Sequence, residues 1–115
     1  MRRYLNADEV TAINAYVIRR FGGRHAIRDH GALKSAVGRP ESGYYADAIE
    51  EAEALFESLS QNHPFVDGNK RTAVTSTGVF LLLNGFHLQF TDSVAYAWLI
   101  GLYESAQLNK ANVEA

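Results

Sequence analysis

Residues 70–84 set the strongest limit on how this chain can fold. The run has the length of about four helical turns, ends at Asn84-Gly85, and carries apolar side chains on nearly every face. A helix that is apolar all round is buried by its neighbours. We therefore expect this helix at the centre of the fold, with the remainder of the chain packed around it.

Two segments before it predict helices from local signals. Residues 7–21 carry apolar side chains at helical spacing, and Asn6 with Glu9 resembles a capping box at their start. A glycine pair would end that helix. Asp29 is a plausible cap for a short second helix that ends at Gly38.

A third helix is expected over residues 46–60, where Glu50, Glu53 and Glu57 face water and the apolar residues face inward. The inward set is Ile49, Ala52, Leu55, Phe56 and Leu59. Beyond the central helix, residues 86–90 alternate like a short extended piece. Asp92 would cap a helix to about residue 106, and Asn109 could cap a last one.

Residues 39–45, Arg-Pro-Glu-Ser-Gly-Tyr-Tyr, are loop or hairpin material because proline and glycine interrupt them. The whole predicts an all-α chain, a single domain over residues 1–115 with five or six helices and a small β-hairpin. At 115 residues, of which 47 % are apolar, the chain is large enough to bury a core of its own.

Composition excludes several kinds of protein. There is no cysteine, so disulfides, thiolate catalysis and cysteine-bound zinc are ruled out. The start has no signal-peptide pattern, and the longest apolar stretch, residues 79–83, is too short to cross a bilayer. We therefore expect a soluble, cytoplasmic protein without a membrane partner.

Charge is unevenly spread, although the net charge is only −2. Residues 1–40 carry eight Lys/Arg and three Asp/Glu, whereas residues 41–62 carry six acidic residues and no Lys/Arg. A weakly acidic chain argues against direct nucleic-acid binding. The arginine cluster from Arg19 to Arg28 is either a solvated helix end, favoured by the helix dipole, or a surface for an acidic partner.

Residues 63–71, His-Pro-Phe-Val-Asp-Gly-Asn-Lys-Arg, carry the candidate chemistry. The turn sequence at 67–69 leads into the central helix, and free backbone N–H groups at a helix start form a natural phosphate site. Lys70 and Arg71 lie in the first turn, where cations oppose the helix dipole. They make sense if an anion, such as the phosphates of a nucleotide, lies above that turn.

A base and a metal ligand flank the same turn. His63 can accept a proton from a hydroxyl, and Asp67 is a hard oxygen ligand of the kind that holds Mg²⁺. Together these groups suit phosphoryl or nucleotidyl transfer. The structural alternative is that Asp67 or Asn69 caps the helix, His63 bonds locally, and the two cations are solvated. The remaining histidines show no metal-site spacing, and no P-loop pattern is present.

Residues 63–71 resemble the signature loop of the Fic/Doc superfamily, and most closely its Doc (death-on-curing) toxin branch. The resemblance extends from residues 28–33 through Arg39-Pro40, Tyr44-Tyr45 and Asn62 to residues 84–85, which is roughly half the chain. It implies a compact Fic-type helical domain that uses ATP and Mg²⁺.

The resemblance implies a role for each loop residue. His63 would be the base that deprotonates a protein hydroxyl, Asp67 would hold Mg²⁺, and Phe65 would support the loop from below. The residues for the anion hole and the nucleotide phosphates would be Gly68, Asn69, Lys70 and Arg71, and Lys70 and Arg71 would join His63 in catalysis. The flap that aligns a target peptide, by strand addition, would contain Pro40, Gly43, Tyr44 and Tyr45.

Two positions distinguish the branches of the family. Adenylyl-transferring members generally have glycine where this chain has Lys70, and a second arginine where it has Val74. Doc-type proteins share both changes. They resemble kinases that bind ATP in the reverse sense and deliver its γ-phosphoryl group to a threonine of translation elongation factor Tu, which arrests growth. The alternatives are an adenylyltransferase and a non-catalytic binding module.

The resemblance also implies a protein partner. Many Fic proteins carry an inhibitory helix of the form Ser/Thr-x-x-x-Glu-Gly/Asn, and this chain has no such run. A small, separate antitoxin protein (Phd-like) is therefore expected. It would dock on the region Arg19 to Arg28 or in an apolar groove between helices, and the sequence does not choose between the two.

Overall fold

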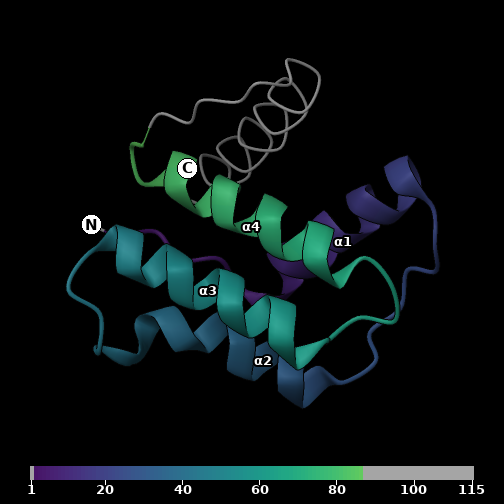
Figure 1. The fold of residues 1–115 in the computed structure, drawn as a ribbon, viewed down its shortest axis with the longest axis horizontal. Coiled ribbons are helices and arrows are strands. Elements are labelled where there is room, and N and C mark those ends of the chain that lie inside the picture. Colours follow the sequence, from purple (N-terminus) through teal and green to yellow (C-terminus); the bar gives the residue numbers. More distant parts are fainter. Residues whose placement is uncertain (1, 87–115) are drawn as a thin grey trace, which may run out of the picture.

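The computed structural model of the chain describes residues 2–86 (Figure 1). Except for Phe86, the elements predicted over residues 86–90 and 92–106 and after Asn109 lie outside these residues, as does His87. Within them the structure contains four α-helices and one short 3-10 helix. The all-α prediction is confirmed for this part of the chain.

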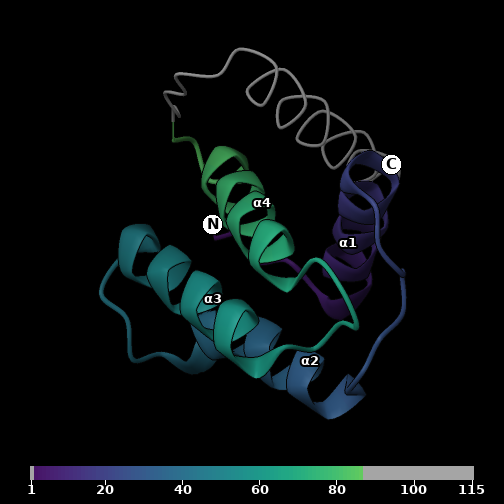
Figure 2. The same ribbon diagram turned by 45° about the vertical axis from the view of Figure 1, so that its right-hand side comes forward.

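The central helix is α4, Asn69–Leu83. It packs between α1, Ala7–Phe21, on one side and α3, Ala48–Asn62, on the other (Figure 2). The short helix α2, His30–Gly38, runs along α3 on the side away from α4 (Figure 1). The prediction of a buried central helix is confirmed, except that Val74 faces outward and is 50 % exposed.

Helix starts follow the local signals in the sequence. Asn6 Oδ1 accepts a 2.8 Å hydrogen bond from the Glu9 N–H, and the Glu9 carboxylate accepts one of 2.9 Å from the Asn6 N–H. This is the predicted capping box. Asp29 caps α2 by accepting from the Ala32 N–H at 3.0 Å. The start of α3 is later than predicted, because Asp47 caps it.

The inward face of α3 differs from the prediction at two positions. Ala52, Leu55 and Leu59 are buried as expected, but Ile49 and Phe56 are 43 % and 37 % exposed. The part of the α3 surface that contacts α2 and α4 is narrower than the apolar face of the helix, so these two apolar side chains are left at its edge. Ile49 and Phe56 instead line a surface groove between α3 and α4.

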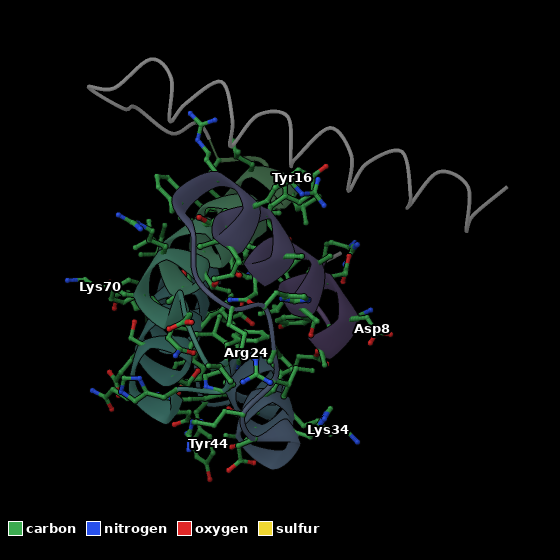
Figure 3. The ribbon with its side chains drawn as sticks, turned by 90° about the vertical axis from the view of Figure 1, so that its right-hand side faces the viewer. Asp8, Tyr16, Arg24, Lys34, Tyr44 and Lys70 are labelled. Carbon is green, nitrogen blue, oxygen red and sulfur yellow. The ribbon has the colours of Figure 1, made fainter. Side chains whose placement is uncertain are left out.

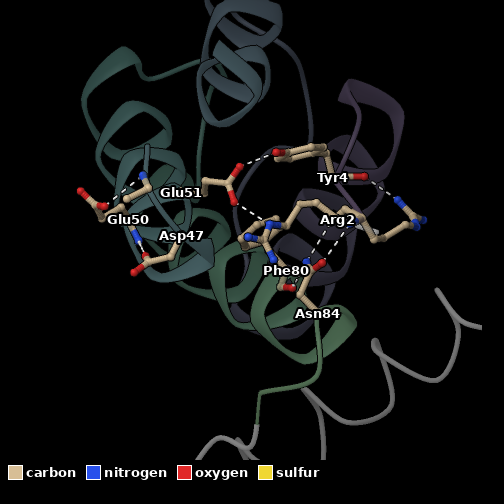
Figure 4. A network of polar contacts seen from close by, with 9 residues as sticks. Arg2, Tyr4, Asp47, Glu50, Glu51, Phe80 and Asn84 are labelled. Carbon is tan, nitrogen blue, oxygen red and sulfur yellow. Dashed lines mark hydrogen bonds and ion pairs between the residues drawn. The ribbon is translucent and has the colours of Figure 1, made fainter. Parts of the chain in front are cut away.

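The N-terminal segment is fastened to α3 and to the end of α4 (Figure 4). Arg2 Nε lies 2.6 Å from a carboxylate oxygen of the buried Glu51, and the Tyr4 hydroxyl donates to the other oxygen. These partners compensate the burial of the Glu51 charge. The Asn84 side chain accepts from the Arg3 N–H and donates to the Arg3 carbonyl, both at 2.9 Å.

The predicted hairpin over residues 39–45 is not confirmed. Arg39–Ser42 form the 3-10 helix η1, because Pro40 fits the fixed φ of a first helical turn, and Gly43 ends it with φ 89°. The one β-bridge that the structure records within residues 2–86 pairs Ile27 with Phe65. None of the helices over residues 2–86 is long and apolar enough to span a membrane.

Candidate active site

The loop that joins α3 to α4 begins at His63, the C-cap of α3. His63 has φ 48° and ψ 56°, a left-handed backbone that is uncommon outside glycine, and its side chain is exposed. Pro64 and Phe65 follow and are buried, with Phe65 packed into the main hydrophobic core. The loop therefore has two buried residues at its base and a histidine that faces solvent, and the supporting role of Phe65 stays a prediction.

Asn69 closes the loop with its side chain. Its Oδ1 accepts a 2.9 Å hydrogen bond from the Phe65 N–H, and its Nδ2 donates one of 2.8 Å to the Phe65 carbonyl. Both polar groups of the amide are satisfied within the loop. Asn69 therefore does not cap α4 with its side chain, which removes one of the structural alternatives.

Helix α4 begins without a side-chain cap. Its N-cap is Gly68, which has φ 75° and ψ 18° and which has no side chain that could accept from the first turn. Two features favour glycine at this position. Its φ lies in the left-handed region, and a Cβ there would approach Val17 Cγ1 to 3.1 Å and Ile18 Cδ1 to 3.2 Å. The first N–H groups of α4 are consequently open to an anion.

Asp67 is exposed, and its orientation is fixed from the connection between α1 and α2. One carboxylate oxygen, Oδ2, accepts a 2.8 Å hydrogen bond from the Arg24 N–H, which leaves the other oxygen for a metal ion. Residues 2–86 contain no cluster of three or more acidic or histidine side chains suited to a metal. A single carboxylate fits Mg²⁺, which is commonly held by one or two carboxylates together with water and substrate phosphates.

A buried amide on α1 ties the loop to the helix that follows it. Asn14 Nδ2 donates to the Asp67 carbonyl and to Thr72 Oγ1, both at 3.0 Å. Its Oδ1 lies 2.7 Å from His25 Nδ1, which must be the donor because an amide oxygen only accepts. The sequence did not predict a role for Asn14 or His25 at this site. The available signal was a lone asparagine on the apolar face of α1, four residues after Val10.

The connection between α1 and α2 runs beside the loop in the opposite direction. The Val66 N–H donates to the Ala26 carbonyl at 2.9 Å, and the Arg28 N–H donates to the Pro64 carbonyl at 2.7 Å. The Arg28 guanidinium also bonds the carbonyl oxygens of His63 and Asn62. Arg28 is therefore turned toward the loop while remaining exposed, and its place in an arginine cluster for an acidic partner stays a prediction.

The two cations of the first turn lie on the outside of α4. Lys70 projects away from the ribbon into solvent (Figure 3). The Arg71 guanidinium lies over the Phe21 ring, 4.1 Å from its centroid, which holds it by a cation–π contact at the end of α1. Phe21, Lys70, Arg71, Val74 and Thr75 line a pocket of about 370 Å³.

The predicted flap is not a hairpin in the structure. Residues 39–42 form η1 beside α3, and Arg39 Nη1 lies 3.2 Å from Glu57 Oε1, six residues before His63 in the sequence. Tyr44 is 89 % exposed and Pro40 is buried. Tyr45 accepts a 2.9 Å hydrogen bond from Arg39 Nε, and this bond, with the nearby Glu57, raises the pKa of Arg39.

Comparison with known proteins agrees with this geometry. A family model described as the Fic/DOC family matches residues 4–81. A protein named Toxin Doc from Mycolicibacterium smegmatis is 41 % identical over 93 residues, which cover 76 % of this chain and 69 % of the relative. A protein named Protein kinase doc from Escherichia phage P1 is 34 % identical over 98 residues, covering 79 % and 74 % respectively. The matched region contains both the uncapped start of α4 and the loop before it, and the chain belongs to the Fic/DOC family, in its Doc toxin branch.

Proposed function

We propose that this chain is the toxin of a toxin–antitoxin system and acts in the cytoplasm as a Mg²⁺-dependent protein kinase. It transfers the γ-phosphoryl group of ATP to a serine or threonine hydroxyl of a translation factor, with elongation factor Tu as the first candidate by resemblance. The names of the two relatives, a toxin and a protein kinase, support this proposal.

The observation that carries the proposal is the uncapped start of α4 beside an exposed histidine. Gly68 leaves the first N–H groups of α4 without a side-chain partner, and Lys70 and Arg71 add positive charge in the same turn. A helix start of this kind attracts phosphate groups strongly. His63 begins the loop that leads into this turn, and Asp67 directly precedes Gly68.

The residues divide the reaction between them. The acceptor hydroxyl gives its proton to the His63 imidazole as its oxygen attacks the γ-phosphorus, and the bond from that phosphorus to the β–γ bridging oxygen breaks to release ADP. The N–H groups at the start of α4 stabilise the charge on the transferred group, with Lys70 beside them. Arg71, braced by Phe21, pairs with the nucleotide phosphates. Asp67 would hold Mg²⁺, which supplies charge neutralisation between the phosphates.

The direction of ATP in the site rests on two side chains. Lys70 adds bulk and a charge where adenylyl-transferring members of the family have glycine. Val74 is half exposed one turn later and offers no charge to a polyphosphate tail. Both favour placing the γ-phosphoryl group, rather than the α-phosphoryl group, at the start of α4.

The test is to incubate the protein and elongation factor Tu with ATP labelled at either the α or the γ position. We expect label to reach the acceptor from the γ position only. Transfer of the α label with release of diphosphate would identify an adenylyltransferase, the second candidate, which the glycine at position 68 and the general form of the loop also suit.

A non-catalytic binding module is the third candidate, and a growth assay separates it from the other two. The variant His63→Ala removes the base while leaving the left-handed backbone position occupied. If expression of a folded His63→Ala protein arrests growth as strongly as the parent, the catalytic proposal is wrong. Co-expression of a small Phd-like antitoxin is expected to relieve arrest by the parent.

A further inference from the structure

The backbone of His63 is held in a conformation that its own sequence disfavours. A residue that precedes proline is pushed toward extended backbone, and a non-glycine residue in the left-handed region costs about 1 kcal/mol or more. His63 has φ 48° and ψ 56°, although Pro64 follows it. Contacts elsewhere in the chain must therefore stabilise this geometry.

Arg28 supplies those contacts through three consecutive carbonyl groups. Its Nε donates to the His63 carbonyl at 2.7 Å, and its guanidinium Nη2 donates to the Asn62 carbonyl at 2.9 Å. Its backbone N–H donates to the Pro64 carbonyl at 2.7 Å. Arg28 thus binds the carbonyl group at the end of α3 and the first two carbonyl groups of the loop.

The position is also electrostatically favourable. The last carbonyl groups of a helix lack partners within the helix, and the helix dipole places partial negative charge there. A guanidinium satisfies two carbonyl oxygens at once with its planar fork, which a lysine ammonium cannot reproduce in the same geometry. Arg28 therefore fixes both the end of α3 and the direction in which the His63 side chain leaves it.

We infer that Arg28 is the positioning residue of the His63 base, acting through the backbone at Asn62 and His63 without touching the substrate. The inference rests on the proposed function in one respect, because His63 is the base only if the chain transfers a phosphoryl group. The geometric part, that Arg28 maintains the left-handed backbone of His63, stands independently of that reaction.

The kinetic test compares Arg28→Ala and Arg28→Lys with the parent, using γ-labelled ATP and elongation factor Tu. We expect kcat to fall about tenfold to hundredfold in both variants, since a small displacement of a catalytic group has an effect of this size. The KM values for ATP and for the acceptor stay unchanged, because the start of α4 is untouched. Lys34→Ala, which removes an exposed cation from α2, is the matched control and keeps the parental kcat.

Two further measurements distinguish a specific loss of His63 positioning from a general loss of structure in the Arg28 variants. In a His63→Ala background, Arg28→Ala has no additional effect on the residual rate, because the group it positions is gone. In the full chain, the ¹³Cα and ¹³Cβ chemical shifts of His63 move toward extended values in both Arg28 variants. A parental kcat in Arg28→Lys, or His63 shifts that do not change in either variant, overturns the inference.

The same data distinguish failure of the inference from failure of the proposed function. If the parent transfers no γ label, the kinase proposal is wrong, and the His63 chemical shifts alone decide whether Arg28 holds the loop. If the parent is active and the Arg28 variants match it in kcat, the kinase proposal survives and the positioning role of Arg28 does not.

Discussion

The side-chain amide of Asn14 and the backbone carbonyl of Asp67 are joined by a 3.0 Å hydrogen bond that spans 53 residues of sequence. The same amide nitrogen also donates to Thr72 Oγ1 on the first turns of α4. A single buried side chain on α1 thereby connects the end of the signature loop to the helix that the loop precedes. The candidate site depends on α1 as much as on the motif itself.

Replacing Asn14 by alanine tests this dependence. The change leaves the buried Thr72 hydroxyl and the Asp67 carbonyl without a donor, so we expect Asn14→Ala to lower the free energy of unfolding by about 1–3 kcal/mol. Urea denaturation measures the change. Thr11→Ala is the control, because within residues 2–86 the Thr11 hydroxyl donates to the Ala7 carbonyl of the same helix and to no other element. Equal, small effects of the two substitutions would show that the Asn14 network contributes little.

Gly68 allows a test that separates backbone strain from crowding. Gly68→Ala and Gly43→Ala both place a Cβ on left-handed backbone, with φ 75° and 89°. At Gly68 the new atom would approach other side chains, at 3.1 Å and 3.2 Å, whereas at Gly43 no atom of residues 2–86 lies within 4 Å. We expect Gly68→Ala to be the more destabilising by about 1–3 kcal/mol, as overpacking usually is. Thermal and urea unfolding of the two variants provide the comparison.

Lys70 is the residue on which the proposed reaction direction depends. We expect Lys70→Gly to reduce transfer of the γ label by about 10²- to 10³-fold, the size typical of removing one stabilising group from a transition state. The assay is the labelled-ATP experiment on elongation factor Tu, with Lys34→Ala controlling for lost surface charge. Retention of parental γ transfer in Lys70→Gly would remove the argument from this side chain.

The hydrogen bond of Tyr4 leads us to expect a loss of stability of the folded chain at alkaline pH. Its hydroxyl donates to the Glu51 carboxylate, and this bond, followed by burial and the Glu51 charge, raises the pKa of Tyr4 above its usual value of 10.0. A raised pKa in the folded state means that the stabilisation is complete below pH 10 and is lost as pH rises through the folded-state value. Melting temperatures of the parent should therefore fall above pH 10 more steeply than those of Tyr4→Phe.

Tyr44→Phe is the matched control for that experiment, because the Tyr44 side chain is 89 % exposed. It should follow the parent over the whole pH range. A parent and a Tyr4→Phe variant with the same alkaline slope would show that the Tyr4–Glu51 bond does not control stability there.

The helix starts could be predicted because their signals are local. Asn6 with Glu9, and Asp29 with the Ala32 N–H, are three residues apart, so the sequence contains both partners of each cap in one window. The burial of α4 could also be predicted from the sequence, since a helix that is apolar on nearly every face is covered by its neighbours. The loop could be identified from the sequence because the residues of its motif are contiguous.

The partners that hold the loop could not be predicted in the same way. Arg28 bonds carbonyl groups 34 and 35 residues away, and Asn14 reaches 53 and 58 residues along the chain. Neither pairing follows from periodicity, because each depends on how α1, α2 and α3 are placed around α4. The hairpin over residues 39–45 is not confirmed for a different, local reason: Pro40 fits a helical turn, and residues 39–42 form η1.

The reciprocal bonds between Asn69 and the Phe65 backbone have a consequence for timing in the cell. They shape the loop from within the chain, so on the proposed function ATP would bind a loop whose shape is already set, at little free-energy cost for ordering it. On the same proposal, each molecule would become active once it has folded. A cell that makes such a toxin is protected only if the antitoxin protein is already present when synthesis of the chain ends. The order in which the two proteins are translated therefore matters as much as the affinity between them.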